Sequence, residues 1–247
     1  MGKRQIIGVI LLFLGSVLAG YAGVNFVVWK IDSERTNAAI TELKKITLTE
    51  RNGDWSAGLE SDENWELAVN FSELLRQNNE TVAWIEVAGT EVSYPVVQTT
   101  DNDFYLDHSF DKSRNSAGWV FLDYRNRSDF ADFNTVVYAH GRLDNTMFGS
   151  LREVYKNKQS FAGTKIRIYT PRANFEYEVI SMYLIQPTDD YIRTSFSDGE
   201  AKEKFVEMIL ARNETTTKGA TGAEQILTLS TCYDAERRLV IHARKVI

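Results

Sequence analysis

One thiol and three imidazoles are the side chains of this sequence best suited to nucleophilic and acid-base chemistry. Cys232 is the only cysteine among 247 residues, and His108, His140 and His242 are the only histidines. One cysteine cannot form an internal disulfide or a multi-cysteine zinc site. The thiol is therefore a buried inert group, a link between two chains, or a nucleophile.

Two of these residues stand where an expected strand ends. Cys232 closes the alternating run 226–232, and His140 closes the run 135–140. A strand end is a rigid platform with an open side, so a thiol there can meet a substrate. The alternative is that Cys232 is a small apolar side chain that completes a core strand. His108, in a polar segment, is expected to be solvated, and His242, within the last strand, to be packed.

An arginine follows Cys232 closely. Arg238 opens the last expected strand, six residues after the cysteine, so the two residues flank one strand-loop-strand hairpin and can point into the same cleft. Arg237 precedes it directly. Because adjacent strand residues point to opposite faces, only one of this pair can face Cys232.

Together these side chains form a chemically sensible set. A thiol can attack a carbonyl, an imidazole can protonate a leaving amine, and a fixed guanidinium can stabilise an oxyanion. A free thiol has a pKa of about 8.5, so a nearby cation would raise the thiolate fraction at neutral pH. The sequence contains no papain-type, caspase-type or C-x-x-C surroundings for Cys232, and no metal-ligand cluster.

An apolar segment near the N-terminus is long enough to cross a membrane. Residues 6–29 carry no charge and would rise about 36 Å as a helix. A cleaved signal peptide is the alternative, but its apolar region is usually about 7 to 15 residues long. Lys3 and Arg4 before the segment favour a cytoplasmic N-terminus. We expect a single-pass membrane anchor, with the remaining chain outside the cytoplasm.

Composition narrows the class of protein further. Hydrophobic residues make up 43% of the chain, enough for a packed core. The formal net charge of -6 excludes a general nucleic-acid binder, which needs a concentrated basic surface. We expect an anchor at 1–30, a stalk or linker at 31–61, helical up to about residue 51 and irregular over 52–64, and a catalytic domain at 62–247.

The catalytic domain is expected to be mainly β. A short amphipathic helix, with apolar residues spaced from Trp65 to Leu75, comes first. Eight short β-rich runs follow, which suggests a barrel or a sandwich: 81–87, 92–98, 118–124, 135–140, 165–170, 175–185, 225–232 and 238–247. Helical patterns over 198–212, between the sixth and seventh runs, and over 146–155 interrupt them.

Several motifs resemble one family. Thr228-Leu-Ser-Thr-Cys, with Arg238-Leu-Val-Ile behind it, resembles the sortase active-site signature. Segments in the same order before it resemble class B sortases: Ala83-Trp-Ile-Glu-Val, Tyr94-Pro-Val-Val-Gln, Asp101-Asn-Asp-Phe-Tyr-Leu, Ala117-Gly-Trp-Val-Phe-Leu-Asp-Tyr-Arg-Asn, Tyr138-Ala-His-Gly and Asn145-Thr-Met-Phe-Gly. The resemblance covers residues 62–247. Ala139 stands where the family usually has glycine, and the loop from Cys232 to Arg238 is short for the class.

The resemblance implies a membrane-anchored cysteine transpeptidase of Gram-positive bacteria, built on the eight-stranded sortase β-barrel with N-terminal helices and a helix between strands six and seven. The family cleaves a C-terminal sorting motif of secreted proteins, forms a thioacyl enzyme and passes the acyl group to a cell-wall peptide amine. It implies no cofactor.

The resemblance also assigns residue roles. Cys232 would be the nucleophile, His140 the general acid and base, and Arg238 the partner of the oxyanion. Ser230 and Tyr191 would lie near the peptide groove. Asp234 stands where a third triad member has been considered, although a solvated loop position is the alternative.

Two other functions remain open at this point. A cysteine endopeptidase would use the same residues but release its product to water. A non-catalytic, membrane-anchored β-barrel would bind a ligand and leave Cys232 merely buried.

Overall fold

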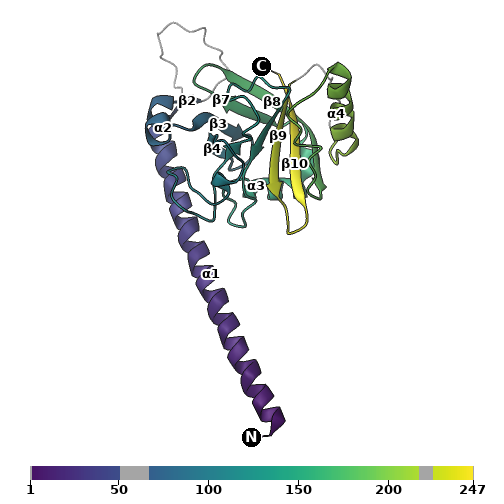
Figure 1. Cartoon of the computed structure of the whole chain (residues 1–247). Helices are drawn as coiled ribbons and strands as arrows, with labels where there is room; N and C mark the ends of the chain where they lie inside the picture. The colour runs from purple at the N-terminus through teal and green to yellow at the C-terminus, as the bar shows by residue number, and fades with distance from the viewer. Residues whose placement is uncertain (1, 51–66, 217–224, 247) are drawn as a thin grey trace.

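The fold is taken from a computed structural model, which describes residues 2–50, 67–216 and 225–246 (Figure 1). The irregular stretch expected over 52–64 lies outside these residues. A single helix, α1 (Lys3–Thr47), runs from the N-terminus to the side of a β-barrel. Within the described residues, it is the one helix long and apolar enough to cross a membrane. Its second half confirms the helix expected after residue 30 and packs on the barrel through the buried side chains of Thr36 and Leu43.

A small two-stranded sheet follows α1. β1 (Leu48–Glu50) pairs with β2 (Leu67–Val69), and α2 (Phe71–Gln77) comes next. The prediction of a helix across Leu67 was therefore wrong in its first half. The cause is Asn70, whose side chain accepts a hydrogen bond from the Glu73 N–H at 3.1 Å and so starts the helix there.

Eight strands close into the barrel that the sequence predicted. Their bounds are β3 (Thr81–Val87), β4 (Ser93–Val97), β5 (Phe121–Leu122), β6 (Asn134–Tyr138), β7 (Lys165–Tyr169), β8 (Asn174–Ile185), β9 (Ile226–Cys232) and β10 (Arg238–Lys245). They lie in the order β10-β8-β7-β3-β4-β5-β6-β9, and β9 pairs with β10 to complete the circle. The third run is much shorter than expected because Gly118, at φ +61°, lies in a turn just before it.

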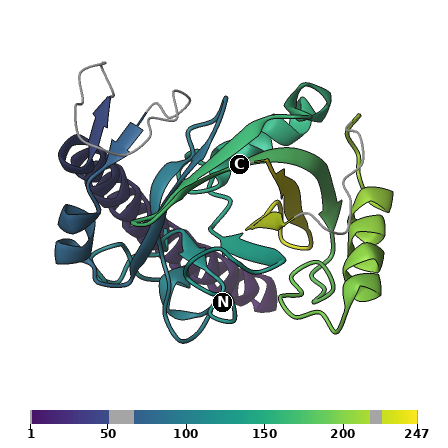
Figure 2. The same cartoon turned by 90° about the horizontal axis from the view of Figure 1, so that it is seen from above.

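Helices cover the barrel on two sides. Figure 2 shows the barrel between α1 and α4 (Gly199–Ala211), the helix expected between the sixth and seventh strands. Asp198 caps α4, because its carboxylate accepts a hydrogen bond from the Ala201 N–H at 2.8 Å. α3 (Gly149–Lys156) starts later than expected, after Asn145 and Met147 in the left-handed region. Two 3-10 turns, η1 (Phe104–Leu106) and η2 (Lys158–Phe161), complete the fold.

The strand directions bring three chain segments to one end of the barrel. β6 and β9 are parallel, so both end there, whereas β10 is antiparallel to β9 and begins there. Residues that the sequence placed at strand ends therefore meet at one rim.

Candidate active site

Cys232 lies at the last position of β9, half-buried, as a free thiol. Leu227 and Leu229 of the same strand pack in the barrel core. Because strand residues alternate between faces, Ser230 and Cys232 point to the other side, away from the core. The thiol therefore belongs to the outer face of the barrel wall.

Arg238 is the direct cross-strand neighbour of Cys232. The β9–β10 register pairs these two residues. Side chains directly opposite each other in an antiparallel pair share one face, with Cβ atoms about 5 Å apart. The guanidinium is thus close to the thiol, as the sequence predicted for one arginine of the pair.

Arg237 and Asp234 are engaged with each other instead. The Arg237 guanidinium donates to the Asp234 carboxylate at 2.6 Å, and the Arg237 N–H donates to it at 2.8 Å. These hydrogen bonds hold the pKa of Asp234 below its usual range. Both residues therefore stabilise the exposed β9–β10 turn, and Asp234 takes the solvated loop position that was the alternative to a triad role.

His140 reaches the same face from the parallel neighbour, β6. The β6–β9 register pairs Tyr138 with Ser230, so His140, two residues further, follows on the face that carries Cys232. The next residue, Gly141, packs against the Cys232 backbone so closely that a Cβ would lie 2.0 Å from the Cys232 carbonyl oxygen. Only glycine fits this approach.

One nitrogen of His140 is already occupied. His140 Nε2 lies 2.7 Å from the Leu106 carbonyl oxygen. A carbonyl oxygen only accepts hydrogen bonds, so Nε2 carries the proton of the neutral ring and Nδ1 carries the lone pair. The ring also lies over Gly118, whose added Cβ would be 3.0 Å from His140 Cδ2. These contacts fix the imidazole and leave Nδ1 as its basic atom.

The remaining histidines do not join the site. His242 is buried as expected, with Nδ1 2.8 Å from the Thr228 hydroxyl and Nε2 2.9 Å from the Tyr183 hydroxyl. Burial lowers the pKa of His242 to about 3. His108 is not solvated as expected. Its side chain is only 20% exposed and its ring stacks on Phe104 at 4.0 Å.

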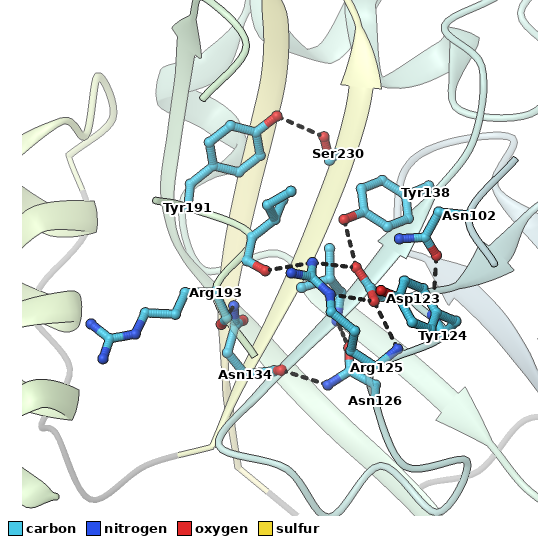
Figure 3. A network of polar contacts seen from close by, with 12 residues as sticks. Asn102, Asp123, Tyr124, Arg125, Asn126, Asn134, Tyr138, Tyr191, Arg193 and Ser230 are labelled. Carbon is cyan, nitrogen blue, oxygen red and sulfur yellow. Dashed lines mark hydrogen bonds and ion pairs between the residues drawn. The ribbon is translucent and has the colours of Figure 1, made fainter. Parts of the chain in front are cut away.

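Tyr191 covers the outer face beside the thiol. It lies on the loop between β8 and α4, and its hydroxyl is 3.3 Å from the Ser230 hydroxyl (Figure 3). Burial raises the pKa of Tyr191, and both Arg238 and Cys232 lie close enough to influence it electrostatically. The structure thus brings together the two residues assigned to the peptide groove and sets one of them near the thiol and the guanidinium.

A buried ion pair holds this loop in place. The Asp123 carboxylate, whose side chain has no exposed area, accepts hydrogen bonds from the Arg125 guanidinium at 2.7 Å and from the Tyr138 hydroxyl at 2.8 Å. Arg125 in turn donates to the Ile192 carbonyl at 3.1 Å (Figure 3). A second tie, from the Asn134 amide to the Arg193 carbonyl at 2.8 Å, lies directly beside it.

The charge of Asp123 is secured by its partners. Burial alone raises the pKa of this carboxyl, but hydrogen bonds from Arg125 and Tyr138 outweigh burial and hold the pKa below its usual range. Sequence reasoning missed this pair. The available signal was an acid and an arginine two positions apart directly after an apolar run, with no glycine between them.

A closed mixed barrel with a strand-end thiol, a facing arginine and a histidine on the neighbouring strand defines a cysteine enzyme of the β-barrel type. Comparisons with known proteins agree with this class. The sortase domain model matches residues 85–246. The chain is 31% identical to sortase B of Listeria monocytogenes over 189 residues, which is 74% of this chain and 76% of that protein.

Solved structures show the same relationship. Sortase B of Bacillus anthracis in complex with AAEK1 is 31% identical, with a TM-score of 0.74 over 87% of this chain and 98% of that one. A sortase B complexed with triglycine is 29% identical, with a TM-score of 0.64 over 71% and 85% of the two chains. The chain belongs to the sortase family, in class B, and is a cysteine transpeptidase of this type. The family acts on sorting-motif substrates and on glycine-containing peptides.

Proposed function

We propose that Cys232, His140 and Arg238 catalyse the transfer of a sorting-motif acyl group from a secreted protein to a cell-wall amine, on the outer side of the membrane that α1 spans. The observation that carries the proposal is the direct pairing of Cys232 with Arg238 across β9 and β10. The packing of Gly141 on the Cys232 carbonyl supports it by drawing His140 to the same rim.

The first half of the reaction breaks the peptide bond of the sorting motif. The Cys232 thiolate attacks the carbonyl carbon, and the guanidinium of Arg238 stabilises the negative charge that develops on the carbonyl oxygen. Protonated His140 donates a proton to the leaving amine. Because Nε2 is held by the Leu106 carbonyl, Nδ1 is the atom that transfers this proton.

The second half uses the same groups in reverse. An acceptor amine attacks the thioester carbon, Nδ1 of neutral His140 accepts the amine proton, and the tetrahedral intermediate again places its charge beside Arg238. Collapse of the intermediate forms the new amide and releases the thiolate. Ser230 and Tyr191 would border the donor peptide, because their hydroxyls meet 3.3 Å apart on the face that carries Cys232.

The membrane anchor belongs to the same proposal. The large apolar side chains of the first half of α1 are exposed, which is the arrangement of a helix that contacts lipid. Lys3 and Arg4 at its start favour an N-terminus inside the cell, with the barrel outside. The acceptor would then be a peptidoglycan precursor or a wall peptide.

A paired arginine experiment tests the catalytic assignment. We expect Arg238→Ala to lower kcat/KM for a sorting-motif peptide with triglycine as acceptor by about 10²- to 10³-fold, as expected for loss of an oxyanion partner. Arg237→Ala, one residue away on the opposite face, is the matched control and should change it less than about threefold. Mass spectrometry should show an amide-linked product. Equal losses in the two variants, or unchanged cleavage by Cys232→Ala, would contradict the proposal.

A further inference from the structure

The second half of α1 is fixed to the loops that flank His140. The Asp32 carboxylate accepts hydrogen bonds from the Ser116 backbone N–H at 3.0 Å and from the Ser116 hydroxyl at 2.6 Å. The Ser33 hydroxyl donates to the Asp144 carboxylate at 2.6 Å. Asp32 and Ser33 are both more than nine-tenths buried, so these contacts are shielded from water. The helix and the two loops therefore form one rigid unit.

These loops lead directly to the proposed catalytic groups. The loop that contains Ser116 continues into Gly118, on which the His140 ring rests. The loop that contains Asp144 begins at Gly141, which packs on the Cys232 carbonyl. The position of the thiol and the imidazole relative to α1 is thus determined by short, specific contacts.

The same contacts set the height of the loop relative to the membrane. The uncharged run ends at Trp29, and the Arg142 guanidinium lies 5.7 Å from the centre of the Trp29 ring. Ser33, which binds Asp144, is only four residues further, or about 6 Å along the helix axis. Tryptophan favours the boundary between lipid and water, so the loop lies at that boundary.

Tilt of the helix does not remove this coincidence. Single spans are tilted by about 20° on average, which shifts a point about 10 Å from the helix axis by only about 3 to 4 Å in height. Figure 1 shows the β9–β10 hairpin and α3 at the end of the barrel that faces the N-terminal half of α1. The rim that carries Cys232 is thus directed toward the bilayer.

The tip of this loop has the composition of a membrane contact. Leu143 is 80% exposed, the highest fraction among the large apolar side chains of the described residues. Its neighbours Arg142 and Asp144 are tied to α1, so it cannot easily turn inward. The hollow beside Leu143 is also lined by Arg152 and Lys156. An apolar side chain among cations suits a surface of anionic lipid headgroups.

We propose that the loop 142–146 is a second membrane contact, in which Leu143 enters the interfacial region of an anionic bilayer beside α1 and holds the catalytic rim against the lipid surface. The proposal rests on α1 spanning the membrane, as proposed above. It makes α1 a positioning element as well as a tether, because the helix sets both the height and the direction of the rim.

Depth-dependent fluorescence quenching tests this contact on the full chain in phosphatidylglycerol-containing vesicles. Cys232→Ala removes the native thiol, and a nitrobenzoxadiazole label is attached to a cysteine introduced by Leu143→Cys. The matched control is Arg172→Cys. Arg172 is exposed and lies in the β7–β8 turn, at the end of the barrel opposite Cys232, because Arg238 pairs with Ile185 and Lys245 with Tyr177.

We expect lipids that carry a spin label at carbon 5 to quench the label at position 143 at least twofold more than the label at position 172. A spin label at carbon 12 should quench it less, because the site is interfacial. Equal quenching at the two positions, in protein that floats with the vesicles, would overturn the proposed contact while leaving the anchor intact. Protein that fails to float would instead overturn the membrane-spanning role of α1 and this proposal with it.

Discussion

The ion pair between Asp123 and Arg125 should control both stability and substrate binding, and Arg125→Met tests this. The substitution keeps much of the side-chain volume but removes the charge that faces a fully buried carboxylate. Asp123 would keep the hydrogen bonds from the Arg125 backbone N–H at 2.9 Å and from the Tyr138 hydroxyl at 2.8 Å. The carboxylate would nevertheless lose its only ion-pair partner among the described residues.

The expected cost follows from the burial of the two partners. Removing one member of a fully buried ion pair costs about 3 to 5 kcal/mol. The Arg125 side chain is 37% exposed, so solvent already screens part of the interaction and we expect about 2 kcal/mol. For a domain of this size, that corresponds to a fall in Tm of about 4 to 8 °C. Loss of the hydrogen bond to the Ile192 carbonyl should also loosen the loop that carries Tyr191.

Thermal unfolding and steady-state kinetics of the full chain in detergent micelles provide the measurements. Arg127→Met is the matched control, because Arg127 forms an exposed pair with Asp129 that should contribute less than about 1 kcal/mol. We expect Arg125→Met to raise KM for the sorting peptide about fivefold, the equivalent of one hydrogen bond, with kcat within about twofold.

A double variant distinguishes the buried charge from a general packing defect. Adding Asp123→Asn to Arg125→Met neutralises the carboxylate but keeps an acceptor for Tyr138, so it should recover about 1 kcal/mol of the loss. The reasoning is refuted if Arg125→Met melts within about 1 °C of the wild type, a margin set well below the expected shift. It is also refuted if the double variant is less stable than the single one.

Three further substitutions probe other parts of the structure. Gly141→Ala should lower kcat at least about tenfold, since its Cβ would collide with the Cys232 carbonyl, whereas Gly199→Ala, with open space around it, should leave activity unchanged in the same peptide assay. Asp32→Ala should lower the free energy of unfolding by about 1 to 3 kcal/mol in a denaturant titration, because two buried donors lose their acceptor. His242 has a lowered pKa in the folded protein, so the unfolded chain binds the proton first and stability falls as the pH drops from about 6.5 toward 3. His242→Gln should reduce this slope by up to about 1.4 kcal/mol per pH unit in unfolding measured between about pH 7 and 4.

Local sequence patterns predicted most of the elements. Each of the eight expected strands is present, and α4 begins one residue after its expected start. Alternation and turn residues are short-range properties, so the chain reveals them without knowledge of the fold. The failures have local causes as well, since Asn70 and Gly118 set element boundaries that the apolar pattern alone did not show.

Part of the site was equally accessible. Cys232 and Arg238 lie six residues apart on one hairpin, and strand alternation predicted that just one of two adjacent arginines would face the thiol. Which of them does so depends on the register. The structure pairs Cys232 with Arg238, and Arg237 turns to Asp234.

The sequence by itself determined which chemical groups the protein has, which segments are strands and helices, and that a thiol and a guanidinium share a hairpin. Only the tertiary structure decided that β6 lies parallel to β9, and so that His140 reaches the thiol from far along the chain. It alone revealed the buried pair that holds the Tyr191 loop and the docking of α1 on the loops around His140. Such contacts depend on which strands become neighbours and in which register, and many alternative pairings are compatible with the same alternation.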